Sequence, residues 1–373
     1  MSHFIKKYDT DCPKDAMCAV LDDSIMYKGQ PVTAGSKMLE NFISPITAAA
    51  VAKLENAGIV VVGKAKMDEF GVSGLFPSAS EEQKSGISGA VAVVAEGEAD
   101  FALCNDYTGA ISIEAAENGL YYIHPTYGSV SRYGLIPTVA SMDQIGIVCR
   151  SPEKGQHVLS IISGFDASDG VMPKSDPQTA KNSRETAERD HENTDEIHKN
   201  PKVGVPIGTT GLNADFNGQN LSSPYEIIEI ELKYSAIYKQ VMQILCSAEL
   251  SAAISRYDGI KFGYRAKEYS NLEELYKKSR SETFGSDVKL AAIMGAMVLS
   301  EGNYLKYYDK AMRIRRLIRD SLDFQKYDVI ISHPHLARLC GLPAVTIPHD
   351  GGALTLIANA GCEEILFSML RKS

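Results

Sequence analysis

Residues 105–119 (NDYTGAISIEAAENG) hold the side chains of this chain that are best placed for chemistry. They follow a short apolar run, residues 101–104, which predicts a strand, and open α/β sheets usually keep their sites at strand ends. Ser112 carries one hydroxyl of this segment that could attack a carbonyl carbon. A hydroxyl is a weak nucleophile at neutral pH until a base within hydrogen-bonding reach removes its proton. Lys28 and Lys64 are the candidate bases.

Two histidines, His333 and His335, flank Pro334, and two imidazoles at this spacing can bind a metal ion. No cysteine or carboxylate cluster accompanies them, although a protein metal site normally draws on such ligands. The glycine-rich run at residues 86–89 lacks the Lys-Ser/Thr ending of a phosphate-binding loop. We therefore predict neither a metal nor a cofactor.

Several stretches of the chain resemble the amidase signature family, and within it the A subunits of glutamine-dependent tRNA amidotransferases. Residues 61–70 (VVGKAKMDEF) are similar to the GKTNMDEF segment of that family. Residues 124–135 (HPTYGSVSRYGL) and 141–146 (SMDQIG) resemble KPTYGRVSRYGL and SLDQIG. Residues 256–260 (RYDGI) and 272–278 (LEELYKK) resemble RYDG and LEELYK. The resemblance implies an α/β protein with the amidase signature fold, in which a mixed β-sheet core is covered by helices on both faces.

The chemistry implied by the resemblance uses two serines and a lysine. One serine attacks an amide carbonyl, the second relays its proton, and a neutral lysine serves as the base. Aligned without gaps, the nucleophile position falls on Ala110, the relay position on Gly86 and the lysine position on Asp22. Loss of one member of such a unit typically costs on the order of 10⁴ to 10⁶ in turnover. The degenerate triad predicts a catalytically inactive protein.

An alternative register keeps a nucleophile. It uses Ser112, with Ser85 or Ser88 as the relay, in an amidase or amidotransferase with rearranged catalytic residues. This register needs two inserted residues before Ser112 and two deleted ones before Gly119, whereas the register of Ala110 needs none. It also provides no lysine at the end of the first strand.

The residues that would hold glutamine are altered as well. In the A subunits a tyrosine and an arginine contribute to this contact, and counting outward from Tyr257 places them on Met242 and Ala291. An arginine pairs bidentately with a carboxylate through its planar fork, which alanine cannot do. The resemblance therefore implies a degenerate cleft around Thr108, Gly109, Met242 and Ala291.

Composition fits one large protein domain without an obvious nucleic-acid surface. The 373 residues are 44% hydrophobic and carry a net charge of −9, whereas binding of nucleic acid in general needs clustered positive charge. Seven cysteines are scattered without zinc-site spacing, which predicts reduced thiols. We find neither the apolar core of a signal peptide nor a run of roughly 18 apolar residues that would span a membrane. These features predict a cytoplasmic protein.

Helical and strand patterns alternate around the segments that carry the chemistry. Residues 48–57 predict a helix that stops at Gly58, residues 59–63 a buried strand, and residues 87–95 a second helix. The basic residues within 310–319 predict a helix with a solvated face. Its buried stripe would consist of Met312, Ile314, Leu317 and Ile318.

Residues 173–201 differ from the rest of the chain. Between Met172 and Ile197 the apolar side chains are Ala180 and Ala187, so this stretch cannot bury enough surface to order itself. We interpret it as a polar flexible segment inside a single domain.

We expect residues 1–373 to form one shortened amidase-signature domain that acts by binding a protein or a small ligand. Compared with the family, the chain is trimmed between residues 75 and 85, between residues 210 and 225, and after His335. The expected partners are other amidotransferase-type subunits or a second copy of the chain, and neither a membrane nor nucleic acid.

Overall fold

The computed structural model of the protein describes residues 3–9, 12, 16–76, 87–172, 201–207, 215–216, 219–220, 225–349 and 352–371. Apart from Pro201, the polar segment predicted at 173–201 lies outside these residues. So does Gly86, the relay position of the predicted degenerate triad.

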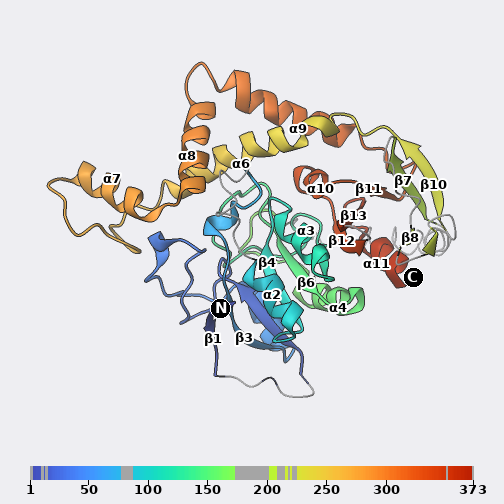
Figure 1. Cartoon of the computed structure of the whole chain (residues 1–373), viewed down its shortest axis with the longest axis horizontal. Helices are drawn as coiled ribbons and strands as arrows, with labels where there is room; N and C mark the ends of the chain where they lie inside the picture. Colours follow the sequence, from blue (N-terminus) through green and yellow to red (C-terminus); the bar gives the residue numbers. More distant parts are fainter. Residues whose placement is uncertain are drawn as a thin grey trace.

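The centre of the molecule is an eleven-stranded sheet in the order β1-β3-β2-β4-β6-β5-β12-β13-β11-β7-β10 (Figure 1). Its strands are β1 (Phe4–Lys7), β2 (Cys18–Asp22), β3 (Val60–Ala65), β4 (Phe101–Asn105), β5 (Tyr121–His124), β6 (Ile145–Cys149), β7 (Lys202–Pro206), β10 (Glu226–Ile230), β11 (Val329–Ile331), β12 (Ala344–His349) and β13 (Gly352–Ala358). A separate pair consists of β8 (Asp215–Phe216) and β9 (Gln219–Asn220). Strand β2 runs parallel to β3 and β4, β7 runs parallel to β10 and β11, and the other pairs are antiparallel. The predicted mixed sheet is confirmed.

Helices cover both faces of this sheet, as predicted. They are α1 (Ala49–Asn56), α2 (Gly89–Glu96), α3 (Ala110–Glu117), α4 (Pro152–Ile162), α6 (Tyr238–Ile254), α7 (Leu272–Thr283), α8 (Ser286–Leu299), α9 (Lys310–Asp320), α10 (Pro334–Cys340) and α11 (Glu363–Arg371), with short turns η1 (Lys37–Leu39), η2 (Glu69–Gly71), η4 (Ser235–Ile237) and η5 (Leu305–Asp309). Helices α2 and α3 pack together over one face, whereas α1, α4 and α11 cover the other.

Strand β4 shows why the chain forms two core layers. Its side chains alternate between the faces, as the pleat of a strand requires. Phe101 and Leu103 pack in the cluster under α1, α4 and α11, whereas Ala102 and Cys104 pack in the cluster under α2. Because both faces are covered, every residue of β4 is buried. The strand therefore holds the turn that follows it in a fixed place.

The local predictions around this strand are confirmed within a few residues. The helix expected at 48–57 is α1, the strand expected at 59–63 is β3, and the helix expected at 87–95 is α2. Helix α9 also forms, but its predicted buried stripe is only partly right. Ile318 is buried, whereas Met312 and Leu317 are exposed, because α9 lies in an outer layer against α6 and α10.

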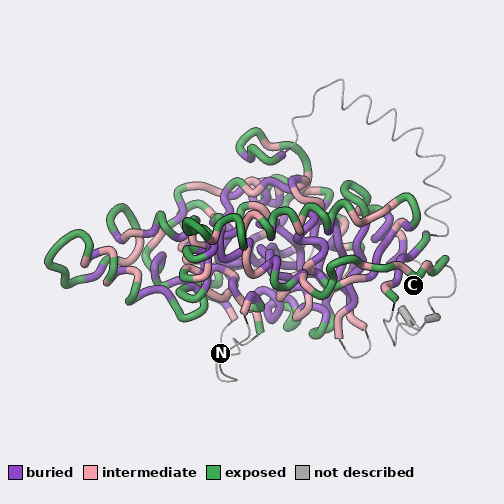
Figure 2. The backbone as a smooth tube through the Cα atoms, turned by 90° about the horizontal axis from the view of Figure 1, so that it is seen from above, coloured by how far each residue is buried: buried purple, intermediate pink, exposed green. Residues whose placement is uncertain are grey.

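Helices α6, α8 and α9 form a layer beyond the sheet, and α7 projects from it at one side (Figure 1). Figure 2 shows a continuous buried centre, with exposed residues concentrated on this projection and the outer helices. Helix α8 approaches α6 closely at Gly295, where an added Cβ would lie 2.1 Å from the carbonyl oxygen of Ser247. None of the helices in the described part of the chain combines the length and apolarity needed to cross a membrane.

Gly134 provides a test of how tightly α1 is placed. Its φ is +86°, and an added Cβ would lie 2.4 Å from the Cα of Ala48, just before α1. We expect Gly134→Ala to lower the free energy of unfolding by about 3 kcal/mol, from left-handed backbone strain and overpacking. Gly119→Ala is the matched control, because Gly119 has φ +74° but no atom within 4 Å of the added Cβ. Gly119→Ala should lower the free energy of unfolding only through backbone strain, by about 1 kcal/mol. Urea unfolding would measure both, and equal costs would contradict the close approach.

Candidate functional site

The turn between β4 and α3 is held by one carboxylate. Asp106 Oδ1 accepts hydrogen bonds from the backbone N–H groups of Gly109 (2.8 Å) and Ile111 (3.2 Å), and Oδ2 accepts one from the N–H of Ser112 (2.9 Å). Gly109, which precedes the first residue of α3, has φ +85° and no side chain to cap the helix. Asp106 therefore satisfies the first N–H groups of α3, which would otherwise lack partners.

Arg338 of α10 completes this arrangement. Its Nη2 donates to Asp106 Oδ2 at 2.8 Å and to Ser112 Oγ at 3.1 Å, and its Nε donates to the Asp106 carbonyl at 3.1 Å. The Arg338 and Asp106 side chains are 0% and 1% exposed. An arginine surrounded by Leu336 and Leu339 in a short apolar helix is a sequence signal for such a buried pair, although Arg338 was not among the predicted site residues.

Ser112 lies inside the protein rather than at a reactive surface. Its hydroxyl donates to the carbonyl of Gly109 at 2.8 Å and accepts from Arg338. The residue is fully buried. Its hydrogen-bonding capacity is therefore largely used within the fold.

Ala110, the predicted nucleophile position, borders a small hollow beside the turn. The hollow encloses about 30 Å³, room for about two water molecules. Thr108 also lines it, and its Oγ1 accepts a hydrogen bond from the N–H of Ala110 at 3.3 Å. The lining comprises Met67, Asp68, Gly71, Ser73, Ser88, Asn105, Asp106, Thr108, Ala110, Ile111 and Glu114.

The charged side chains that line this hollow are acidic: Asp68, Asp106 and Glu114. Burial raises the pKa of Glu114 to about 7, and the nearby carboxylates of Asp68, Asp106 and Glu117 raise it further, against a lowering by the N–H of Ser88. The described lining therefore contains no cationic side chain that could pair with a ligand carboxylate.

The other two residues predicted at the degenerate cleft lie elsewhere. Met242, in α6, is buried in a hydrophobic cluster with Tyr107 and Leu336. Ala291, in α8, is buried in a different cluster. The structure thus brings Thr108 and Ala110 together at the hollow, with Gly109 forming the adjacent turn, whereas Met242 and Ala291 serve as packing residues.

The predicted lysine position, Asp22, lies at the end of β2 in a buried polar cluster. Lys64 Nζ, from the neighbouring strand β3, donates to the carbonyls of Asp22 (3.1 Å) and Ile25 and lies 3.9 Å from Asp23 Oδ1. Among the described residues no donor meets full hydrogen-bond geometry at either carboxylate oxygen of Asp22, although the backbone N–H groups of Ser24 and Asn105 lie near enough to lower its pKa. Lys28, the other candidate base, lies on an exposed turn.

Burial controls the ionisation of this cluster. It raises the pKa of Asp22 to about 7, an effect that Lys64 opposes and Asp23 reinforces. It also lowers the pKa of Lys64 to about 8, against the attraction of the two aspartates. Both residues are thus held in environments that penalise their charged forms.

The two histidines approach each other without forming a metal site. Their ring centroids are 4.0 Å apart, and His333 Nδ1 accepts from the N–H of His335. Burial lowers the pKa of His335 to about 3, and His333, Arg338 and Lys239 lower it further. Among the residues that the structure describes, no group of metal-ligating side chains includes this pair.

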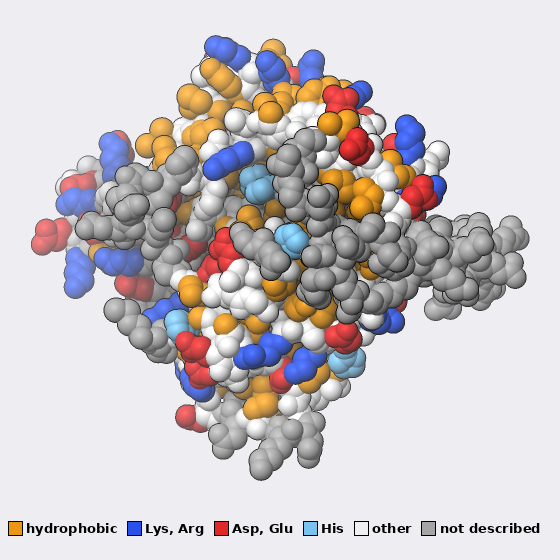
Figure 3. Space-filling view, turned by 45° about the vertical axis from the view of Figure 1, so that its right-hand side comes forward, with side chains coloured by type: hydrophobic (Ala, Val, Ile, Leu, Met, Phe, Trp, Pro, Cys, Tyr) orange, Lys and Arg blue, Asp and Glu red, His pale blue; other side chains and the backbone are white. Residues whose placement is uncertain are grey.

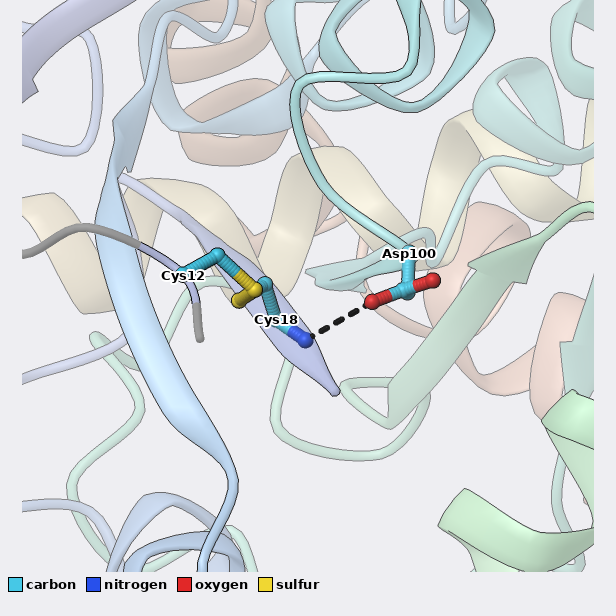
Figure 4. A group of neighbouring side chains, drawn as sticks. All are labelled: Cys12, Cys18 and Asp100. Atoms are coloured by element: carbon cyan, nitrogen blue, oxygen red, sulfur yellow. Dashed lines mark hydrogen bonds between the residues drawn. A yellow bond between two sulfur atoms is a disulfide. The ribbon is translucent and has the colours of Figure 1, made fainter. Parts of the chain in front are cut away.

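Two cysteines depart from the predicted reduced state. Cys12 and Cys18 form a disulfide with Cα atoms 6.0 Å apart, next to Asp100 (Figure 4). The prediction of free thiols was wrong for this pair, because the fold places the start of β2 within disulfide distance of Cys12. Asp100 Oδ2 accepts from the N–H of Cys18 at 2.9 Å and Oδ1 accepts from Lys154 at 2.7 Å. Both carboxylate oxygens therefore already have donors.

Breaking the Asp106–Arg338 pair should be costly. We expect Arg338→Met to lower the free energy of unfolding by about 3–5 kcal/mol, because it leaves a buried carboxylate without its partner. The control, Arg316→Met, removes an exposed pair with Asp320 and should cost less than about 1 kcal/mol. Urea unfolding of both variants decides the matter, and similar small costs would show that the buried pair does not hold the turn.

Asp22 predicts a specific pH dependence. Its folded pKa of about 7 lies above the usual value near 4 of an unfolded aspartate, so the wild-type protein should lose stability as pH rises from about 4 through about 7. Asp22→Asn removes this titration. We expect the variant to be more stable than the wild type at pH 8 by roughly 1–3 kcal/mol and nearly equal at pH 4.

Asp169→Asn provides a control of opposite sign. Hydrogen bonds from Arg132 hold the pKa of Asp169 near 2, so the ionised carboxylate stabilises the fold above pH 4 and its loss should destabilise the protein at pH 8. Urea unfolding at several pH values would measure both variants. A loss of stability in Asp22→Asn at pH 8 would mean that Lys64 stabilises the ionised carboxylate instead.

Comparison with known proteins shows the family to which the chain belongs. The family model described as Amidase matches residues 17–341. The chain is 33% identical over 392 residues to the A subunit of the glutamyl-tRNA(Gln) amidotransferase of Lachnoclostridium phytofermentans, covering 91% of this chain and 76% of the relative. It is 36% identical over 331 residues to the corresponding protein of Acinetobacter baumannii, covering 83% of this chain and 65% of the relative.

Solved structures show the same fold. The A subunit of the glutamyl-tRNA(Gln) amidotransferase of Thermotoga maritima matches with a TM-score of 0.69 at 23% identity, over 98% of this chain and 85% of that one. The native peptide amidase of Stenotrophomonas maltophilia matches with a TM-score of 0.70 at 22% identity, over 95% and 81%. The fold predicted from the resemblance is confirmed, and the chain belongs to the amidase family.

Proposed function

We propose that this protein is a catalytically inactive member of the amidase family that acts by binding. The observation that carries the proposal is Ala110, which borders the hollow at the end of β4 and offers a methyl group where the resemblance expects a serine hydroxyl. A methyl group can neither attack a carbonyl nor take part in proton transfer.

The surroundings of Ser112 favour this function over the alternative enzyme. Its hydroxyl donates to the Gly109 carbonyl and accepts from the Arg338 guanidinium. A nucleophilic serine instead needs its proton directed at a base. Arg338 cannot serve as that base, because a guanidinium stays protonated in proteins. An amidase with Ser112 as nucleophile would require this buried network to open.

The backbone around the hollow provides further support. Stabilisation of a developing oxyanion needs N–H groups that are free to point at the substrate. At this turn the N–H groups of Gly109, Ile111 and Ser112 donate to Asp106, and that of Ala110 donates to Thr108. These donors are therefore engaged within the chain.

The groups that could serve as a base also argue against catalysis by the family mechanism. Lys64 donates to two carbonyl oxygens within the buried cluster at the end of β2. Asp22 stands where the resemblance places the lysine. A carboxylate with a pKa near 7 could accept a proton, but Ala110 has no hydroxyl to give one.

The size and charge of the hollow favour a protein over a small amide as the binding partner. The hollow of about 30 Å³ is far below the roughly 300–1,000 Å³ of ordinary small-molecule sites, and its charged lining is acidic. The relatives are named as one subunit, the A subunit, of an amidotransferase. Their name supports a role in an assembly with other amidotransferase-type subunits or with a second copy of this chain.

Release of ammonia from glutamine, asparagine and simple amides tests the proposal. We expect no turnover above the uncatalysed rate, because removal of one member of a serine-based unit alone costs on the order of 10⁴ to 10⁶. Turnover that disappears in Ser112→Ala would establish the alternative enzyme. Ser131→Ala is the matched control, since Ser131 is also buried and donates to a side chain, Asp166, outside this site; it should leave any turnover unchanged.

A further inference from the structure

A second and larger cavity lies at the C-terminal end of α10. Its volume is about 360 Å³, within the roughly 300–1,000 Å³ of ordinary small-molecule sites. We call it the Arg319 cavity. None of its lining residues lines the hollow beside Ala110, so the two spaces are separate. The lining comprises Thr126, Tyr127, Arg319, Leu322, Phe324, Cys340, Gly341, Leu342, Asn359 and Ala360.

The charge of this lining comes from Arg319 of α9. Figure 3 shows Lys and Arg side chains along the top of the molecule, the end where Figure 1 places α8 and α9. Arg313 and Arg316 pair with carboxylates one turn away along α9. Arg315 donates to the carbonyl of Leu339 at 2.6 Å. Arg319 has no ion-pair partner among the described residues, so its guanidinium is available to a ligand at the cavity.

The remaining polar side chains of the lining also offer donors. Asn359 Oδ1 accepts from the N–H of the next residue at 2.9 Å, which leaves its Nδ2 to donate. Thr126 Oγ1 accepts from the N–H of Gly361 at 2.9 Å, and its hydroxyl keeps a proton to donate. The Tyr127 hydroxyl already donates and accepts within the fold. Because the lining contains neither Asp nor Glu, it complements a ligand group that only accepts, such as a carboxylate.

The C-terminus of α10 does not cancel this preference. Carbonyl groups at a helix C-terminus carry partial negative charge, but those of Ala337 and Leu339 accept hydrogen bonds within the fold. Burial raises the pKa of the Cys340 thiol to about 12, and the positive charges of Arg315 and Arg319 oppose this rise. The thiol therefore stays neutral near pH 7 and adds no negative charge to the wall.

The other part of the wall is apolar and is held by core packing. Leu342 is buried in the same cluster as Met242, and Leu322 and Phe324 pack against that cluster. The ring of Phe324 also meets the ring of Tyr327 edge-on, with centroids 5.5 Å apart. An apolar group placed against these side chains leaves water, and a wall that is already packed loses little freedom when it binds.

We propose that the Arg319 cavity binds a small organic carboxylate. The acid group would pair with Arg319, whose planar fork can hold a carboxylate bidentately, and an aromatic or branched apolar body would contact Leu322, Phe324 and Leu342. Such a lining selects an acid over its neutral amide or its cationic amine. This site goes beyond the proposed function, which assigns a protein partner to the fold.

Ligand-observed NMR titration of the full chain with phenylpropionate, phenylpropionamide and phenylpropylamine tests the site. The acid should bind with a dissociation constant of about 1 mM or lower. The amide should bind about 10-fold more weakly, because it forms no charge-assisted hydrogen bond, and the amine should not bind. Arg319→Gln should weaken binding of the acid by about 10-fold or more and leave the amide nearly unchanged. Arg319 is exposed, so this variant should fold like the wild type.

Two further variants locate the binding. Phe324→Ala should weaken the acid and the amide alike, by about 3-fold or more, because both lose apolar contact. Arg316→Gln is the matched control, since Arg316 lies on the same helix but outside the lining, and it should change neither affinity. If circular dichroism shows that Phe324→Ala is unfolded, Leu322→Ala replaces it with the same expected result.

Four results would each overturn the assignment: no saturable binding of the acid, equal affinity for the acid and the amide, an acid affinity unchanged in Arg319→Gln, or affinities unchanged when the apolar wall is cut back. Release of ammonia from glutamine is measured separately. It would contradict the proposed function and leave the carboxylate site as it stands.

Discussion

The buried ion pair between Asp106 and Arg338 is the interaction on which the candidate site depends. The Asp106 carboxylate accepts hydrogen bonds from three backbone N–H groups at the start of α3 and from the guanidinium of Arg338 in α10. It therefore fixes the turn after β4, the direction of α3 and the position of α10 together. A buried charge pair of this kind is stable only when its hydrogen bonds are complete. Groups committed to holding the turn are not free to act on a substrate.

The same principle underlies our proposal that the fold persists without the family's chemistry. Catalytic sites normally hold ionisable side chains in environments that shift their pKa, because the reaction needs those shifted values. Around the hollow, the chain instead has a methyl group at Ala110 and a hydroxyl at Ser112 whose hydrogen bonds are made within the fold. The backbone N–H groups of the turn also donate within the chain. The cluster of Asp22, Asp23 and Lys64 is the exception, since it retains buried charge without complete hydrogen bonding among the described residues.

The sequence predicted those parts of the structure that follow from local periodicity or from a close motif match. Helix α1 follows from apolar residues at helical spacing, and strand β3 from a continuous apolar run. Asp22 is the last residue of β2, and Ala110 is the first residue of α3, after the turn that follows β4. Contacts between distant segments were not predictable in this way. Arg338 meets Asp106 across 232 residues, and Met312 and Leu317 are exposed because α9 packs at the outside. Cys12 and Cys18 are only six residues apart, but their spacing alone did not predict a disulfide. Met242 and Ala291 matched cleft positions by counting, but the shape of the packed core decides what they touch.

The central claim is that no serine of this protein is activated as a nucleophile. Intact-mass spectrometry after incubation of the native protein with a fluorophosphonate, which forms a stable adduct with activated serines, tests it most directly. An unmodified mass after prolonged exposure is the result expected from Ala110 and the buried hydroxyl of Ser112. A stoichiometric single adduct, mapped to Ser112 or to any serine at the hollow, would contradict the claim.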